Sequence, residues 1–307
     1  MTPAAPPDTI TPAIVGATVG PVTCEIDARW LMAYAAALHE RDPRYFDTLA
    51  THGPRAHPLF AVCYEWPAAV ALRELTIPPA LRSRGVHATH HLVIHRAPRA
   101  GDRLHTVGRV TAVEARRSGT LIVCRFETSD VAGEPVTTTD YGSVYRGVAL
   151  VDAGASTGTG RPGAIETTGP AAGPPATRWT QGVQVAADAA WVYTECARIW
   201  NPIHTDVAVA RAAGLPAPIL HGTATLALAV SRVVACDLDG DAAAVAEVSA
   251  RFTGMVEMPS MLTVRGGQRR RDRIGFDVLN EAGSAVLTAG HLRSRTEISP
   301  VEPRGLE

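Results

Sequence analysis

The chain has 307 residues, of which 46% are hydrophobic and 19% are charged, so it can bury a core and is not a disordered chain. Its formal net charge of −1 gives no overall attraction to nucleic acid or to an anionic membrane. The five cysteines form no CxxC pair, which favours free thiols and a cytoplasmic protein.

The first half of the chain predicts one helical region followed by an antiparallel meander. The run YAAALHERDPRYFD occupies residues 34–47. Four strand-like runs follow at residues 86–96, 103–115, 120–130 and 136–147, separated by turn residues. The next segment, residues 151–177, consists mainly of Gly, Ala, Pro, Thr and Ser without apolar periodicity. We expect a flexible linker there, between an N-terminal half (1–150) and a C-terminal half (178–307).

The second half repeats this order of elements. Asp188 can cap a helix over 189–199, which Pro202 breaks, and Thr205 can cap a short helix that Gly214 ends. An apolar helix over 223–235 comes next; it is too short to span a bilayer, so we expect it to be buried and expect no membrane insertion. Strand-like runs then occupy residues 244–254, 260–268, 273–280 and 284–295.

The two halves also match residue by residue, which indicates an internal repeat. Tyr34 and Tyr193 lie 159 residues apart, and so do Asp47 and Asp206. A buried helix followed by a meander in each half predicts an α+β fold, in which two antiparallel sheets each wrap around a helix.

The richest motif reads Asn-Pro-Ile-His-Thr-Asp from Asn201, followed by Ile-Leu-His-Gly ending at Gly222. This motif resembles that of the MaoC-like (R)-specific enoyl-CoA hydratases and dehydratases. The resemblance implies a double hotdog, in which one chain imitates the family's homodimer. It also implies a hydro-lyase acting on an acyl-CoA or acyl-carrier-protein thioester, without a cofactor beyond that thioester. A homodimer of double hotdogs is a further expectation.

The chemistry of hydration needs the residue types found in this motif. His204 has an ordinary pKa near neutrality and can move protons, with Asn201 as its catalytic partner. Gly222 heads the apolar helix, whose free N–H groups suit a developing oxyanion, and His221 lines the same site. Asp206 is expected to cap the short helix or to support His204.

One departure from the family pattern concerns the catalytic carboxylate. The family's Ser-Gly-Asp is replaced here by Ala197, Arg198 and Ile199. His204 can act alone with Asn201, or Glu195, one helical turn away, can substitute for the missing aspartate. Alternatively, the chain is a non-catalytic acyl-thioester-binding protein or partner subunit, or a hotdog thioesterase.

The first half lacks the motif, because Asp42, Tyr45 and Ala61 stand at the positions of Asn201, His204 and His221. We therefore expect one site per chain, in the second half, with the first half helping to form the acyl and CoA tunnel. Four histidines at 87, 90, 91 and 95 do not predict a metal site, because alternate strand residues at 87, 91 and 95 spread along one face. The arginines at 269–273 predict a solvated hairpin rather than a nucleic-acid site, since no aromatic platform accompanies them.

Overall fold

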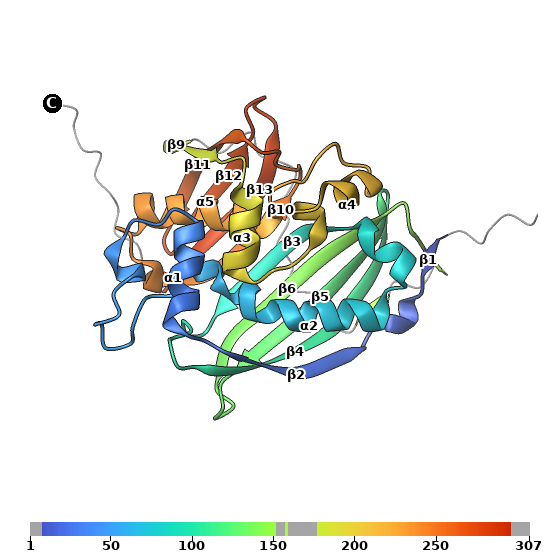
Figure 1. Ribbon diagram of the computed structural model, residues 1–307, viewed down its shortest axis with the longest axis horizontal. Coiled ribbons are helices and arrows are strands. Elements are labelled where there is room, and N and C mark those ends of the chain that lie inside the picture. The colour runs from blue at the N-terminus through green and yellow to red at the C-terminus, as the bar shows by residue number, and fades with distance from the viewer. Residues whose placement is uncertain (1–7, 152–156, 159–176, 296–307) are drawn as a thin grey trace, which may run out of the picture.

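The computed structural model describes residues 8–151, 157–158 and 177–295 and shows two similar halves that share one sheet (Figure 1). This sheet has 11 strands, and its path runs β2, β4, β5, β6, β3, β10, β13, β12, β11, β9, with β8 (Thr157–Gly158) beside β4. A separate two-stranded sheet joins β1 (Thr9–Ile10) to β7 (Ala149–Leu150). No helix of the described residues is long and apolar enough to cross a membrane.

Each half contributes five long strands and a central helix. The first half contains β2 (Thr18–Glu25), α1 (Ala28–Ala37), α2 (Ala61–Thr76), β3 (Gly85–Ile94), β4 (Arg103–Arg116), β5 (Gly119–Ser129) and β6 (Pro135–Arg146). The second contains β9 (Trp179–Val185), α3 (Ala189–Ala197), α4 (Val207–Ala212), α5 (Gly222–Asp237), β10 (Val245–Phe252), β11 (Ser260–Arg270), β12 (Arg273–Leu279) and β13 (Ala285–Ser294). The helices and strands expected from the sequence are present, with ends shifted by a few residues.

The strand order is the same in the two halves, which explains the sequence repeat. From the outer edge inward, each half places its first, third, fourth, fifth and second strand. The two second strands, β3 and β10, pair antiparallel at the centre, where Ser249 lies opposite His91. The α+β double hotdog predicted from the sequence is therefore confirmed, and its two sheets continue into each other.

The central helices differ in how they lie on the sheet. Helix α5 is apolar on most sides, as its sequence indicates, and it packs against β10, β11, β12 and β13. Helix α2 packs instead against β2, β4 and β5. Figure 1 shows α2 crossing the strands of its own half, next to β2. This placement leaves the inner face of β3 and of the later part of β6 to line a cavity, described below.

The three capping predictions differ in outcome. Asp188 stands at the N-cap position of α3 but makes no capping hydrogen bond with its side chain. Helix α4 is capped by Asp206 and not by Thr205, because Asp206 Oδ1 accepts the N–H groups of Ala208 (2.8 Å) and Val209 (3.1 Å). A carboxylate oxygen that accepts hydrogen bonds from two backbone N–H groups stabilises this end of the helix. The predicted linker, 151–177, lies outside the described residues except at 151, 157–158 and 177.

Candidate active site

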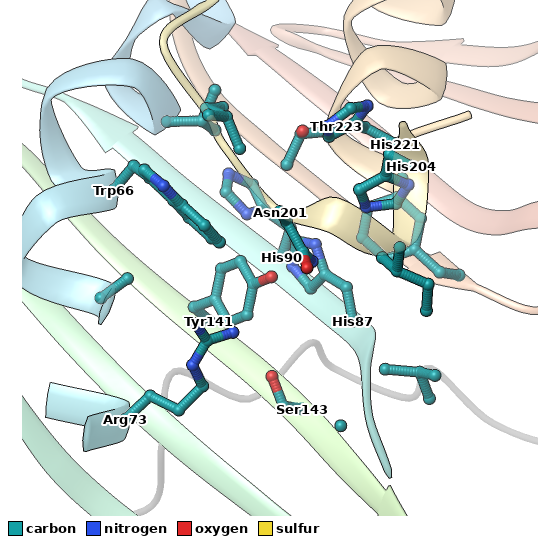
Figure 2. A pocket seen from close by; sticks show the side chains of 18 of the residues that line it. Trp66, Arg73, His87, His90, Tyr141, Ser143, Asn201, His204, His221 and Thr223 are labelled. Atoms are coloured by element: carbon teal, nitrogen blue, oxygen red, sulfur yellow. The ribbon is translucent and has the colours of Figure 1, made fainter. Parts of the chain in front are cut away.

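A cavity of about 220 Å³ contains the motif that the sequence singled out (Figure 2). The second half lines it with residues from the segment 199–204, from the start of α5 and from the segment 252–256. The first half lines it with one side of α2 and with the inner faces of β3, β5 and β6. The cavity is thus built by both halves of the repeat.

His204 is the imidazole best placed to move a proton. It ends the short 3-10 turn Pro202–His204, where the fixed backbone of Pro202 turns the chain. Its Nδ1–H donates to the carbonyl of Ile219 at 2.8 Å, so Nε2 is the unprotonated nitrogen. Burial lowers the pKa of His204 to about 4. The ring is therefore neutral at pH 7, with a lone pair available at Nε2.

His221 stacks against the ring of His204. The two imidazoles stack with their centroids 3.7 Å apart and an interplanar angle of 26°. His221 Nε2 lies 3.3 Å from the hydroxyl of Thr194, on α3. Burial and then the neighbouring His204 lower the pKa of His221, and the carbonyl of Ile199 opposes them. His221 is thus a neutral, buried side chain that holds His204 in place as well as lining the cavity.

Gly222 opens α5 at the cavity wall. The first backbone hydrogen bond of this helix runs from the N–H of Thr225 to the carbonyl of His221, at 3.0 Å. The N–H groups before Thr225 thus lie at the positive end of the helix and can donate hydrogen bonds to a ligand oxygen. A Cβ at position 222 would lie 3.3 Å from the ring of Phe252, so glycine keeps this approach open.

Asn201 stands beside His204 with its amide group uncommitted. It is the N-cap residue of the 3-10 turn, but its side chain makes no capping hydrogen bond. Figure 2 shows the side chain extending from the turn into the cavity, across from His90 and Tyr141 of the first half. The amide can therefore hold a water molecule or a substrate oxygen.

The family's aspartate position holds a buried alkyl group. Ile199 is 4% exposed and lines the cavity, where it cannot accept a proton. Glu195 is exposed on α3 and does not line the cavity, so the structure does not bring it to His204. Asp206 is likewise outside the cavity lining and serves as the cap of α4.

A carboxyl group that the motif did not reveal enters from the first half. Glu65, on α2, is the one acidic side chain among the described residues that line the cavity. Its Oε1 accepts hydrogen bonds from Thr139 (2.7 Å) and Thr137 (3.1 Å). Burial raises the pKa of Glu65 to about 8, so the carboxyl is mostly protonated at pH 7. The sequence signal was a single glutamate in the apolar start of a helix.

The histidine-rich strand β3 differs from its prediction. The pairing register with β6 skips Ala88, and this bulge turns His87 to the same inner face as His90. His91 faces the other side, where the carboxylates of Asp140 and Glu247 raise its pKa to about 9. The prediction that residues 87, 91 and 95 spread along one face of the strand was therefore wrong. Among the described residues, no group of three or more candidate ligands is arranged to hold a metal ion.

The first-half counterpart of the site holds no imidazole at the position of His204. Tyr45 occupies that position, at the end of the turn Pro43–Tyr45, and is buried 6.2 Å from the ring of His57. Asp42 accepts hydrogen bonds from Arg44, and Ala61 begins α2.

Comparison with known proteins identifies related domains in each half. The model of the MaoC-like domain matches residues 172–289, and that of the FAS1-like dehydratase domain region matches residues 13–139. The chain is 39% identical over 90 residues to enoyl-CoA hydratase ChsH3 of Mycobacterium tuberculosis, over 29% of this chain and 32% of that protein. It is 45% identical over 53 residues to peroxisomal enoyl-CoA hydratase 2 of Arabidopsis thaliana, over 17% of each. A UPF0336 protein of Saccharopolyspora erythraea is 33% identical over 130 residues, 41% of this chain and 83% of that one.

Solved structures share the fold over nearly the whole chain. A MaoC-like dehydratase from Phytophthora capsici superposes with a TM-score of 0.76 at 20% identity, over 92% of this chain and 97% of that one. A conserved hypothetical protein of Mycobacterium tuberculosis, described as a double hotdog, gives a TM-score of 0.60 at 16% identity, over 92% and 96%. The second half therefore contains a MaoC-like domain and the first half a FAS1-like dehydratase domain region, and the chain as a whole shares the double hotdog fold of these solved structures.

Proposed function

We propose that this protein is a hydro-lyase that adds water to, or removes it from, the acyl chain of a CoA or carrier-protein thioester. The observation that carries the proposal is the neutral ring of His204, whose Nδ1 is fixed on the carbonyl of Ile219 and whose Nε2 is left as an acceptor. The hydratase relatives and the dehydratase domains support the same reaction class.

His204 serves in this proposal as a base and then as an acid. Its Nε2 takes a proton from a water held by Asn201, while the water oxygen bonds to the β-carbon of the enoyl thioester. The same proton then passes from Nε2 to the α-carbon, which completes the addition. Because burial lowers the pKa of His204 to about 4, its protonated form is a strong acid for the second step. The enolate oxygen accepts hydrogen bonds from the free N–H groups at the start of α5, at Gly222.

The proposal assigns the two halves different roles. The second half, residues 178–307, carries the site, and the first half, residues 1–150, supplies the acyl side of the tunnel through α2, β3 and β6. It also takes the protein to be cytoplasmic and to form a homodimer. A second candidate function, a non-catalytic acyl-thioester-binding protein or partner subunit, is favoured by Ile199, which cannot transfer protons.

The test follows the absorbance of the conjugated thioester with a panel of trans-2-enoyl-CoAs. We expect turnover, and we expect His204→Ala to lower the rate about 10²- to 10⁴-fold. The matched control, His95→Ala, changes an exposed histidine outside this cavity and should leave the rate unchanged. Since His204 is neutral above its pKa of about 4, its own titration should leave kcat/KM flat from pH 6 to 8 and lower it towards pH 4. Folded protein that turns over no chain length, yet binds CoA esters after His204→Ala, would support the binding protein instead.

A further inference from the structure

The acyl side of the cavity has an unusually polar wall for a tunnel that would hold an alkyl chain. Helix α2 contacts β6 only near its start, through Glu65, and the bulge at Ala88 turns His87 and His90 inward beside Tyr141. Figure 2 shows these side chains on the sheet, facing the turn that carries Asn201. The wall therefore presents hydrogen-bonding groups to whatever occupies the cavity.

His90 is the central observation. It is 0% exposed, it lines the cavity, and neither of its ring nitrogens has a hydrogen-bond partner within the described residues. Burial lowers the pKa of His90 to about 3, so the ring is neutral and offers one donor and one acceptor. Buried polar groups are costly to leave unpaired, which indicates that a ligand supplies the missing partners.

Tyr141 lies next to this histidine and is held by stacking. Its ring stacks on His87 at 3.7 Å and meets His90 edge-on at 6.2 Å. Burial raises the pKa of Tyr141, so its hydroxyl keeps its proton. His87 is already satisfied, because its Nε2 lies 3.1 Å from the carbonyl of Thr89. His90 and Tyr141 thus present free hydrogen-bonding groups side by side on this wall.

The titratable groups nearest to His90 on this wall are uncharged. Glu65 is mostly protonated at pH 7, and His90 is uncharged. Arg73, on α2, is the charged group of this wall: it lines the cavity beside Tyr141, its guanidinium lies over the ring of Trp66 at 5.8 Å, and its Nε has no partner within the described residues (Figure 2). A hydroxyl or carbonyl oxygen can satisfy His90 and Tyr141 without bringing a charge into this buried region.

From these contacts we propose that the first-half wall binds an oxygen substituent, a hydroxyl or a keto group, on the acyl chain of the thioester. This inference rests on the proposed function, because it takes the cavity to be the acyl-thioester site. His90 and Tyr141 are its specificity-determining residues, and the substituent lies away from the carbons that gain or lose water.

The test measures binding with saturated thioesters, which cannot be hydrated. The probes are decanoyl-CoA and decanoyl-CoAs with one hydroxyl or keto group at carbons 5 to 9. We expect at least one oxygenated isomer to bind about 10- to 100-fold more tightly than decanoyl-CoA, as expected for a site built to hydrogen-bond the substituent. His90→Leu should reduce this ratio of affinities about tenfold or more. Tyr141→Phe, which removes only one hydroxyl, should also reduce the ratio, and it provides the test if the leucine variant does not fold.

The control is His95→Leu, which makes the same change at an exposed position beyond the end of β3 and should leave the ratio unchanged. The inference is overturned if no oxygenated isomer binds more tightly, or if the preference survives both His90→Leu and Tyr141→Phe. Tightest binding of an ω-carboxydecanoyl-CoA that depends on Arg73 would also overturn it. Turnover of enoyl-CoA without tighter binding of an oxygenated isomer would contradict only this inference. Tighter binding of an oxygenated isomer without turnover would contradict only the proposed hydro-lyase activity.

Discussion

At the scale of a single residue, Ile199 is the main difference between this site and the family pattern. Its side chain fills the position of the aspartate and belongs to the same buried apolar cluster as Tyr193 and Leu220. The neighbouring groups that hydration needs, His204, Asn201 and the start of α5, keep their arrangement around the cavity. Under the proposed function, the site thus lacks one proton-transfer group of the family pattern.

Restoring that group should separate the two candidate functions. Ile199→Asp is expected to raise the rate on simple trans-2-enoyl-CoAs at least tenfold, because the carboxylate can share the proton transfers with His204. It should also lower the free energy of unfolding by about 2 kcal/mol, since a carboxylate then replaces a buried alkyl group. Rate and melting temperature are measured together, with Ile199→Asn as a control of similar size to aspartate that cannot accept a proton. A folded Ile199→Asp protein with no gain would mean that the cavity serves another reaction, or binding alone.

The sequence could predict only part of the site, for a physical reason. His204, Asn201, His221 and Gly222 form one motif within 22 residues, so their spacing reveals them. Glu65, His90 and Tyr141 come from the other half of the chain. They reach the cavity only because β3 pairs with β10 and because α2 lies to one side, and no local pattern encodes that packing.

At the scale of elements, local backbone features decide which faces meet. Alternation along β3 predicts the faces correctly after the bulge, where His91 and His90 point to opposite sides, but it fails before it, because one extra residue reverses the order. The end of α3 is a second such feature. Arg198 takes the left-handed conformation there, with φ of 58°, where the family pattern has glycine.

The strain at the end of α3 can be measured with paired variants. Arg198 lies over the ring of Trp30 at 4.1 Å and pairs with Asp27 at 3.6 Å, contacts that both Arg198→Ala and Arg198→Gly remove. Glycine adopts a positive φ without the Cβ clash, so the glycine variant should be more stable than the alanine variant by about 1 kcal/mol. Chemical denaturation of the two proteins gives this difference directly. Equal stabilities would show that the left-handed backbone carries no strain here.

At the scale of the whole molecule, the repeat is visible in both sequence and structure. Tyr34 and Tyr193, which the constant offset of 159 residues relates, meet with their hydroxyls 3.3 Å apart in the packed pair α1 and α3. The repeat of elements predicted the fold because each half builds the same strand order. The offset helix α2 was not predictable, since its apolar sequence is compatible with either position on the sheet.

The continuous sheet predicts that neither half is stable alone. A separated half would expose β3 or β10 as an open edge and uncover apolar surface, such as Tyr34 or Tyr193, that now faces the other half. We expect residues 8–151 and 177–295 to be insoluble when expressed separately and to form a soluble 1:1 complex when coexpressed. As a control, the full chain with a protease site inserted within residues 159–176 should stay associated after cleavage, since β3–β10 pairing does not depend on a covalent link. Gel filtration with light scattering, together with circular dichroism, reports both states. A monomeric, well-folded second half would contradict this prediction, because its edge strand and its face towards the first half would then be stable in water.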